Sequence, residues 1–541
     1  MKTKTTIKQI GLLLSFGILN VSILIAQELP EEKQEIIKTF EAQLEEARMI
    51  EVAPDIQPVI PAKKKYGYNV TILPLDITYP EPVIKPIAAD ADLPFENHTF
   101  FTRLGYGNLK NPTADLGFYK TDQYQFDRYL NVSYNGFDNS SKIQNQKLND
   151  ASAVAGIRYK IKENWQINAG VNGAYKQNPM YFVYADPVAN AERNIFRAGF
   201  KAEILHETIN EDDLDFSLAT TYSVVNVSNP DVNEGLFDVK TQVSKNRGNW
   251  KLTFPLQFTG VLQSNISDLY ALRFFPELKY SRSSWHLTAG AAIYYDAQEK
   301  TVPWPQINFD HALSGKSLHI FAGSKLRIEA NNLHRLSAEN PWLNPALSKL
   351  TNFLGKEIFG GVRGEGKILG YEIAAGYVNG RNWDQFNNIA SQMNASAFFT
   401  QLKAAFLRSS VDFAVSDNVV ISGTLIKNFF HKNGAAHLYG LHTFECKAQA
   451  QFKFWNGKVK LTPELFVTDR SWTQIEDDVP GTLVDVRLNN RVELNTTLDI
   501  WFSNKLGIYL RGGNLLNNRY EQWFGYPVLG IHGQGGILLK L

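Results

Sequence analysis

Residues Trp165 to Lys176 have the sequence WQINAGVNGAYK, in which apolar and polar side chains alternate. Trp165, Ile167, Ala169, Val171, Gly173 and Tyr175 form the apolar series, and Gln166, Asn168, Asn172 and Lys176 belong to the polar one. Successive side chains of a β-strand point to opposite faces, so this period of two predicts a strand with one apolar face. The run exceeds an average strand of about five or six residues and is long enough to cross an outer membrane.

The same alternation continues from about His98 to Leu541. It is clear in Phe196–Ile204, in Leu214–Tyr222 and in the long run Val484–Phe502. The last run keeps one parity throughout, which predicts a strand that crosses the membrane and continues beyond it.

Tight and long connections alternate between these strands. The tight ones, mostly with the Asn, Asp and Gly of short turns, are Glu163-Asn164, Arg247-Gly248, Arg282-Ser283, Ser314-Gly315, Asp417-Asn418, Asn456-Gly457 and Ser503-Asn504. The long ones are Phe137–Asp150, Gln177–Ala191, Asn331–Leu354, Gly380–Ser391, His431–Gly440, Arg470–Gly481 and Asn517–Leu529. This rhythm predicts an all-β, transmembrane, antiparallel up-and-down β-barrel over residues 97–541, with about 22 strands and both termini on the periplasmic, short-turn side.

Two of the predicted strands are irregular: one contains a proline and the other is short. Pro255 lies inside the strand Trp250–Leu262, and because proline cannot donate a ladder hydrogen bond, we expect a bulge or strand end there. The piece Gln306–Ala312 is short for a spanning strand. Aromatic residues near strand ends predict interfacial girdles, namely Tyr106, Tyr134, Trp165, Tyr181, Trp250, Tyr280, Trp285, Tyr294, Trp455 and Trp501.

The N-terminus predicts export. Lys2, Lys4 and Lys8 precede the apolar run Ile10–Ile25, which is too short to span a membrane, and we expect cleavage after Ala26. Residues 1–26 are therefore interpreted as a signal peptide. Residues 27–96 combine a charged, helix-compatible part with a proline-rich part, and are expected to be periplasmic. They are interpreted as a minimal plug, or as a docking strap for a periplasmic or envelope protein.

Bulk composition excludes several classes. The mean hydropathy of −0.25 argues against a helical membrane protein but is compatible with a barrel, whose strands alternate polar and apolar residues. The formal net charge of +1 gives no bias towards nucleic acid. The single cysteine, Cys446, excludes an intramolecular disulfide and is interpreted as a small apolar strand residue. The predicted location is the outer membrane of a Gram-negative cell.

The sequence predicts no catalytic, cofactor-binding or metal-binding residue, and no enzyme. The ten histidines form no HExxH motif or paired metal spacing. Charged pairs such as Glu203 with Asp215, or Arg487 with Glu493, are expected from inward-facing parity alone. The run Glu211-Asp212-Asp213 lacks the spacing of a calcium loop and is interpreted as a solvated periplasmic turn.

The C-terminus resembles a known family. Asn514-Leu515-Leu516-Asn517-Asn518-Arg519-Tyr520, then Tyr526-Pro527, Gly530 and a closing strand Gly535–Leu541, is similar to the end of a TonB-dependent receptor barrel, and the expected strand number equals that family's. The resemblance implies an outer-membrane receptor inserted by the barrel assembly machinery and surrounded by outer-membrane lipid. The Ala26-Gln27 junction resembles exports of Bacteroidetes. The chain departs from the family because the roughly seventy mature residues before His98 are too few for a plug domain, so siderophore or vitamin transport is not carried over.

Two functions stay open at this point. The first is a channel or transporter for an unknown solute; the second is a non-transporting scaffold or accessory subunit of an outer-membrane assembly or secretion complex. The loop Asn331–Leu354, with its Asn340-Pro341-Trp342-Leu343-Asn344-Pro345 motif, is expected either to bind a ligand or to fold inward and narrow the pore.

Overall fold

The computed structural model describes residues 99–122, 125–162, 164–184, 192–208, 214–264, 266–388, 395–431, 437–476, 479 and 482–541. All of them belong to one compact unit, Ala91–Leu541. The expected signal peptide at 1–26, the segment 27–96 and the acidic run 211–213 lie outside the described residues. Among the residues described, no helix has the length and apolarity needed to cross a membrane.

The large sheet contains strands β1 Phe100–Gly107, β2 Asn111–Asp122, β3 Phe126–Asp138, β4 Lys147–Lys162, β5 Trp165–Pro179, β6 Glu192–His206, β7 Leu214–Val227, β8 Val232–Arg247, β9 Trp250–Gln263, β10 Leu269–Phe274, β11 Glu277–Arg282, β12 Trp285–Asp296, β13 Lys300–Ser314, β14 Leu318–Asn331, β15 Thr351–Glu365, β16 Leu369–Asn388, β17 Ala395–Ser416, β18 Val419–His431, β19 Phe444–Phe454, β20 Val459–Thr468, β23 Arg491–Trp501, β24 Leu506–Gly513 and β27 His532–Lys540. The smaller elements are helix α2 Leu333–Glu339, the hairpin β21 Trp472–Glu476 with β22 Leu483–Arg487, and the hairpin β25 Glu521–Trp523 with β26 Tyr526–Pro527.

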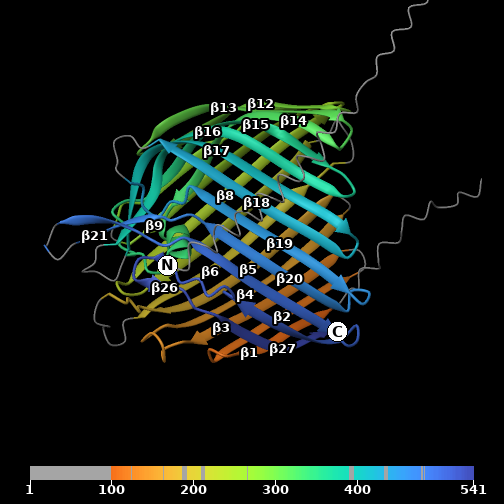
Figure 1. Ribbon diagram of the computed structural model, residues 1–541. Helices are drawn as coiled ribbons and strands as arrows, with labels where there is room; N and C mark the ends of the chain where they lie inside the picture. The colour runs from red at the N-terminus through yellow and green to blue at the C-terminus, as the bar shows by residue number, and fades with distance from the viewer. Residues whose placement is uncertain are drawn as a thin grey trace, which may run out of the picture. The chain divides into compact units, whose positions relative to one another are not determined.

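The sheet closes into a barrel. Each strand pairs antiparallel with the next, and β1 pairs with β27 as well as with β2 (Figure 1). The sheet has 23 labelled strands, but β10 and β11 both pair with β9 and with β12, so they are two parts of one interrupted strand. The barrel therefore has 22 strands, which confirms the predicted fold class and number.

The interruption between β10 and β11 lies opposite Pro255 of β9. Phe274 pairs with Leu256 and Glu277 pairs with Thr253, so the residues opposite Phe275 and Pro276 are Phe254 and Pro255, outside regular pairing. The Pro255 carbonyl still accepts a hydrogen bond from the Phe275 amide at 3.1 Å. β9 itself is unbroken at Pro255, which pairs with Gln242 of β8, so the bulge or strand end expected there is not found. The irregularity lies instead in the neighbouring strand, at Phe275 and Pro276. The piece Gln306–Ala312 is the middle of a longer strand, β13.

An apolar belt covers the outward face of the barrel. On β5, Trp165 and Tyr175 are exposed and lie ten positions apart, and on β12 the same holds for Trp285 and Tyr295. With a rise of about 3.3 Å per residue and a tilt of roughly 40°, ten residues span about 25 Å, the height of an outer-membrane apolar band. Three residues expected in the girdles do not lie there. Tyr294 and Trp501 belong to the inward series of β12 and β23, and Tyr181 lies beyond the end of β5 and is buried.

Six of the predicted tight turns lie in full among the described residues, each between consecutive strands on one rim, which we call the short-turn rim. The seventh, at 163–164, includes Glu163, which lies outside the described residues. Gly248 and Gly457 have φ values of 56° and 81°, which favour glycine in these turns. The barrel also begins and ends on this rim, where the Leu541 amide donates to the Phe100 carbonyl at 2.9 Å. In outer-membrane barrels this rim faces the periplasm.

The opposite rim, the loop rim, departs from the predicted rhythm. Three of its connections are short, at 108–110, 228–231 and 297–299, and β16 continues to Asn388 through most of a predicted loop. The single strand expected over Val484–Phe502 is two strands, β22 and β23, separated at 488–490. Asn490 interrupts the apolar series at this break, but Thr496 interrupts it likewise inside β23, so a single polar residue does not by itself predict a break. β22 pairs with β21 in a separate hairpin, while β20 pairs directly with β23.

Candidate functional site: the barrel lumen and its loop cap

The inward face of the barrel carries many charged side chains. The outward series of β6 includes Phe196, Phe200 and Ile204, so the inward series contains Lys201 and Glu203. Several ion pairs join inward residues. Lys201 pairs with Glu203 at 3.2 Å and Lys240 with Asp238 at 3.6 Å, each within one strand. Pairs that reach across an intervening strand are Lys251 with Asp215 at 3.3 Å, Arg408 with Glu357 at 3.1 Å and Arg363 with Asp310 at 2.8 Å. The lumen wall is therefore polar and of mixed charge.

The two charged pairs expected from sequence are not formed. Glu203 pairs with Lys201, and Asp215 pairs with Lys251 rather than with Glu203. Glu493 pairs with Arg491 at 2.9 Å, whereas Arg487 belongs to the β21–β22 hairpin and stacks on Trp472. Sequence parity identified the inward face correctly for Glu203, Asp215 and Glu493, but it could not identify partners across strands.

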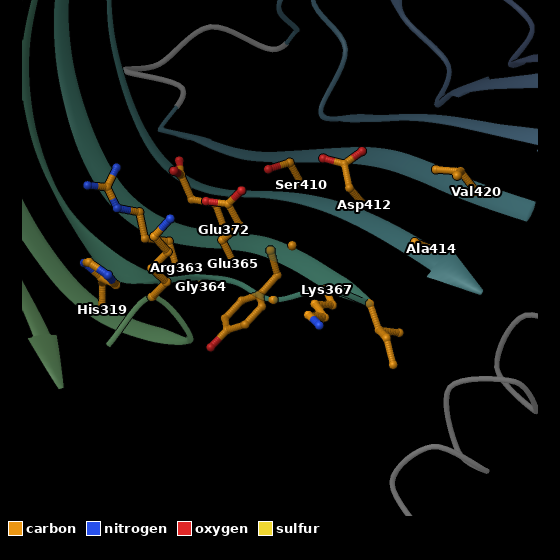
Figure 2. Close-up of a pocket in the computed structure, with 15 residues that line it drawn as sticks. His319, Arg363, Gly364, Glu365, Lys367, Glu372, Ser410, Asp412, Ala414 and Val420 are labelled. Carbon is orange, nitrogen blue, oxygen red and sulfur yellow. The ribbon is translucent and has the colours of Figure 1, made fainter. Parts of the chain in front are cut away.

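A cavity of about 630 Å³ lies at the short-turn end of the lumen (Figure 2). His319 Nδ1 and the Arg363 guanidinium both contact the buried Asp310 carboxylate at 2.8 Å. Figure 2 shows Glu372 and Asp412 on the neighbouring strands β16 and β17. Ser422 Oγ donates to Asp412 at 2.5 Å. Cations and carboxylates side by side suit a hydrated polar solute, and the described residues contain no cluster arranged to hold a metal ion.

Loops from several strands meet at the other end and form what we call the loop cap. Four loops contribute buried apolar residues to the cap: the β5–β6 loop, the β14–β15 loop with α2, the β22–β23 connection and the β24–β27 loop. These residues pack on inward side chains at the loop-rim ends of β6 to β10 and on β16, and the two groups form one buried cluster. They are Tyr181, Phe182, Ile195, Val225, Val227, Val232, Val261, Leu269, Leu333, Leu336, Leu343, Leu347, Leu350, Phe386, Leu488, Trp523, Phe524 and Tyr526. The cap thus brings together loops from different sides of the barrel.

Helix α2 is fastened by a buried carboxylate from another strand. Glu234 of β8 is 2% exposed, and it accepts hydrogen bonds from the Leu333 amide at 2.8 Å and the His334 amide at 2.9 Å. Asn332 caps the same helix through its side-chain oxygen, which accepts from the Arg335 amide at 3.1 Å. The first amides of a helix lack intrahelical partners, so these acceptors fix the start of α2. Sequence reasoning missed Glu234 because it looks like any other inward polar residue.

Further polar side chains of the barrel wall hold the rest of the β14–β15 loop. Arg197 donates to Ser337 Oγ at 2.8 Å, and Gln263 donates to the Pro345 carbonyl at 3.1 Å. The buried Arg193 guanidinium donates to the Leu343 carbonyl. The two arginine bonds are charge-assisted, and such bonds are roughly twice as strong as neutral ones.

Aromatic stacking joins three of the loops. Trp342 stacks on Tyr526 with ring centroids 4.0 Å apart, and Tyr184 stacks on Phe524 at 4.7 Å. The Tyr184 hydroxyl also donates to Glu521 at 2.8 Å. Of the two roles considered for the loop Asn331–Leu354, the structure has it folded inward, where it narrows the barrel at the loop rim.

One carboxyl of the cap is strongly perturbed. Desolvation by the surrounding loops and the nearby Asp384 carboxylate raise the pKa of Glu339 to about 7, although 44% of its side chain is exposed. Arg335 opposes the shift through an ion pair with Glu339 at 3.1 Å, and it also contacts Asp384 at 3.2 Å. Glu339 therefore changes charge near neutral pH.

Solved structures of outer-membrane receptors share the fold of this barrel. The chain is similar to a mutant of the ferric enterobactin receptor PfeA of Pseudomonas aeruginosa, with a TM-score of 0.61, 10% identity, and coverage of 82% of this chain and 80% of that chain. It is also similar to the pyoverdine outer membrane receptor FpvA of P. aeruginosa (TM-score 0.61, 8% identity, 82% and 79% covered). The ferric-catecholate import receptor Fiu of E. coli gives a TM-score of 0.59 at 11% identity, with 82% of each chain covered.

No protein-family model and no curated protein matches the sequence. At such low identity the structural likeness establishes the fold alone. Together with the apolar belt and its aromatic girdles, it identifies the chain as a large β-barrel of the cell outer membrane.

Proposed function

We propose that this protein is a transport barrel of the outer membrane, which moves a polar solute along its charged lumen and is narrowed at the loop rim by the loop cap. The observation that carries the proposal is the lumen wall. Away from the loop cap many inward side chains are charged or amide-bearing, and a cavity of about 630 Å³ lies at the short-turn end. A barrel that served only as a scaffold would have no need of a hydrated interior of this kind.

The segment before the barrel has a place in this proposal. Residues 1–26 are a signal peptide, and residues 27–96 act from the periplasmic side, either as a minimal plug or as a strap that docks a periplasmic or envelope partner. Insertion by the barrel assembly machinery follows from the outer-membrane location. The chain is not proposed to be an enzyme, because sequence and lumen geometry offer no arrangement that favours one reaction.

Planar-bilayer conductance tests the proposal with three proteins. They are the full-length chain, a variant in which residues 333–350 are replaced by a short Gly-Ser linker, and a variant lacking Gln27–Pro94. We expect little conductance from the full-length chain. Shortening the α2 loop should open the loop rim, and removing the N-terminal segment should open the periplasmic side if that segment is a plug. Heat-modifiable migration on gels is the control that each barrel has folded.

The outcomes separate the two functions left open by the sequence. A large, stable conductance from either variant supports a solute path through the lumen. If both variants fold and neither conducts, alone or combined, the lumen is filled by other parts of the protein. The transport proposal is then wrong, and a scaffold in an envelope assembly replaces it.

A further inference from the structure

The wall of the barrel is not continuous between β13 and β14. Their ladder runs from Ser314–Leu318 at the short-turn rim only as far as Ile307–Ser324. Between this ladder and the loop rim, residues 300–306 of β13 still pair with β12, and residues 325–331 of β14 still pair with β15. Within the described chain these two stretches do not pair with each other. We call this unpaired region the seam.

The sequence of β13 explains where the ladder stops. Pro303 and Pro305 lie two positions apart, and the ladder to β12 continues past both of them. The N–H groups of successive residues point to opposite edges of a strand, so those of residues two apart share one edge. Because the ladder to β12 continues past both prolines, both nitrogens face the β14 side. The edge of β13 that faces the seam therefore lacks two donors. This also lowers the cost of leaving that edge unpaired inside a membrane, where an N–H without a partner is expensive.

On the loop-rim side of the ladder, the β12–β13 hairpin and the β14–β15 hairpin overlap. Ala292, Tyr294 and Val302 belong to the inward series of β12 and β13, whereas Leu326 and Leu354 belong to the outward series of β14 and β15. All five are buried in one cluster, with Trp304 and Ile328 packed against it. The inward face of one hairpin thus covers the outward face of the other. The space between these two layers leads from the lumen to the lipid, and apolar side chains fill it in this structure.

The seam lies in the outer part of the apolar belt. On β12 the belt extends from Trp285 to Tyr295, and the partners of Gly290 and Tyr295 on β13 are Gln306 and Thr301. The seam therefore runs alongside the outer half of this segment and ends near the outer girdle. Near the loop rim, the Ala330 carbonyl of β14 has a hydrogen-bond donor, since Arg335 of α2 donates to it at 2.6 Å.

Polar groups inside the seam do not fit a purely structural apolar contact. Trp304 Nε1, Gln306 Oε1 and Ser324 Oγ are buried and have no hydrogen-bond partner within the described residues. Lys356, which is outward-facing on β15, places its ammonium 5.1 Å from the centre of the Trp304 ring, and no ion pair is recorded for it among the described residues. Trp304 pairs with Ala292, inside the belt segment Trp285–Tyr295. A lysine ammonium within the apolar belt is costly unless a counter-charge or water reaches it.

We infer that the seam is a lateral portal that binds an anionic amphiphile, with its carboxylate or phosphate head at Lys356 and Trp304 and its apolar chain between the two layers. Such a molecule supplies the acceptor that Trp304 Nε1 lacks and the counter-charge that Lys356 lacks. Its chain replaces the packing between Val302 and Leu326 without exposing them to water. The direction of travel, between lumen and outer leaflet, rests on the proposed transport function; the binding site does not.

Photolabelling of the full-length protein in lipid vesicles tests the portal. Two probes carry a diazirine in an acyl chain: palmitic acid, which represents a free solute, and phosphatidylglycerol, which represents a membrane lipid. Labelled peptides are mapped by mass spectrometry. We expect labelling of the seam strands to fall at least fivefold in Lys356→Gln. The matched control is Lys403→Gln, which removes an outward lysine of β17 that has no contact with the seam in the described residues.

A reversible staple keeps the test independent of misfolding. In a Cys446→Ser background, a disulfide between Val302→Cys and Leu326→Cys should abolish seam labelling, and reduction should restore it. A second pair, Phe309→Cys with Ala322→Cys on the hydrogen-bonded ladder, should leave labelling unchanged. A variant with Pro303→Val and Pro305→Val, which returns the two donors, should also reduce labelling because the strands can then pair.

The results test the inference and identify the source of the ligand. Labelling by palmitate alone identifies a free amphiphilic solute, and labelling by phosphatidylglycerol identifies bound lipid. Equal labelling of seam and belt, unaffected by the staple or by Lys356→Gln, means that the seam is a static packing layer and overturns the inference. A protein that conducts solutes in bilayers but shows this equal labelling keeps the transport function and loses the portal.

Discussion

At the scale of single residues, Glu234 is the polar group on which the loop cap depends most directly. Its carboxylate caps α2 from another strand, in a site with almost no exposure. Glu234→Gln keeps the shape but removes the charge and replaces one acceptor by a donor, which should cost about 1.5–3 kcal/mol locally. Hydrogen exchange of residues 333–347 should become at least tenfold faster. The control Glu277→Gln alters an inward carboxylate that pairs with Lys279, and it should leave α2 unchanged; equal effects of both would contradict this role of Glu234.

Glu339 makes the same loop sensitive to pH. Its pKa is raised from 4.5 to about 7, so the closed loop favours the protonated carboxyl. Below pH 4.5 the Glu339 carboxyl is protonated in both the closed and the open loop, and above pH 7 it is ionised in both. The closed loop is therefore destabilised as pH rises between these limits. Relative to Glu339→Gln, wild-type exchange over residues 333–347, corrected for intrinsic rates, should be similar at pH 4.5 and faster at pH 8. A difference that grows as pH falls would refute the assignment, because a lowered pKa gives that sign.

At the scale of elements, the β21–β22 hairpin is separable from the wall. β20 pairs with β23 along its whole length, from Val459–Ile500 to Thr468–Arg491, so the barrel does not need the hairpin for closure. Replacing residues 472–487 by a short Gly-Ser linker should leave heat-modifiability of the barrel intact. It should loosen the cap, since Ile475 and Val486 pack against the buried cluster. Faster exchange confined to the cap is the expected result, and loss of the folded barrel would show that the hairpin belongs to the closure.

The elements also show what the sequence could predict. The barrel class, the parity of most strands and the tight turns among the described residues depend on local chemistry, namely alternation and turn residues, and these predictions are confirmed. The break between β22 and β23 has a weak local signal, the polar Asn490 in the apolar series, which Thr496 repeats inside β23 without a break. The seam depends on Pro303 and Pro305, whose effect requires knowing which strand edge they face. Glu234 could not be identified because its partners, Leu333 and His334, lie about a hundred positions away.

At the scale of the whole molecule, the chain separates two environments by parity alone. Val171 is 59% exposed on the outward face of β5, between the girdle residues Trp165 and Tyr175, and the next residue, Asn172, is exposed on the inward face. In lipid, the outward position contacts hydrocarbon and the inward position contacts water. Neighbouring residues in the sequence should therefore respond oppositely to the same charged substitution.

Val171→Arg should reduce the free energy of unfolding in vesicles by about 2–4 kcal/mol, the cost of an arginine near the bilayer midplane. Asn172→Arg should change it by less than about 1 kcal/mol, since its guanidinium remains hydrated in the lumen. Reversible denaturant unfolding in vesicles, followed by tryptophan fluorescence, measures both values. The comparison is internal, because the two variants add the same side chain to the same strand one position apart. Equal costs would mean that the inward face is as dry as the outward one, and the hydrated lumen on which the transport function rests would then have to be abandoned.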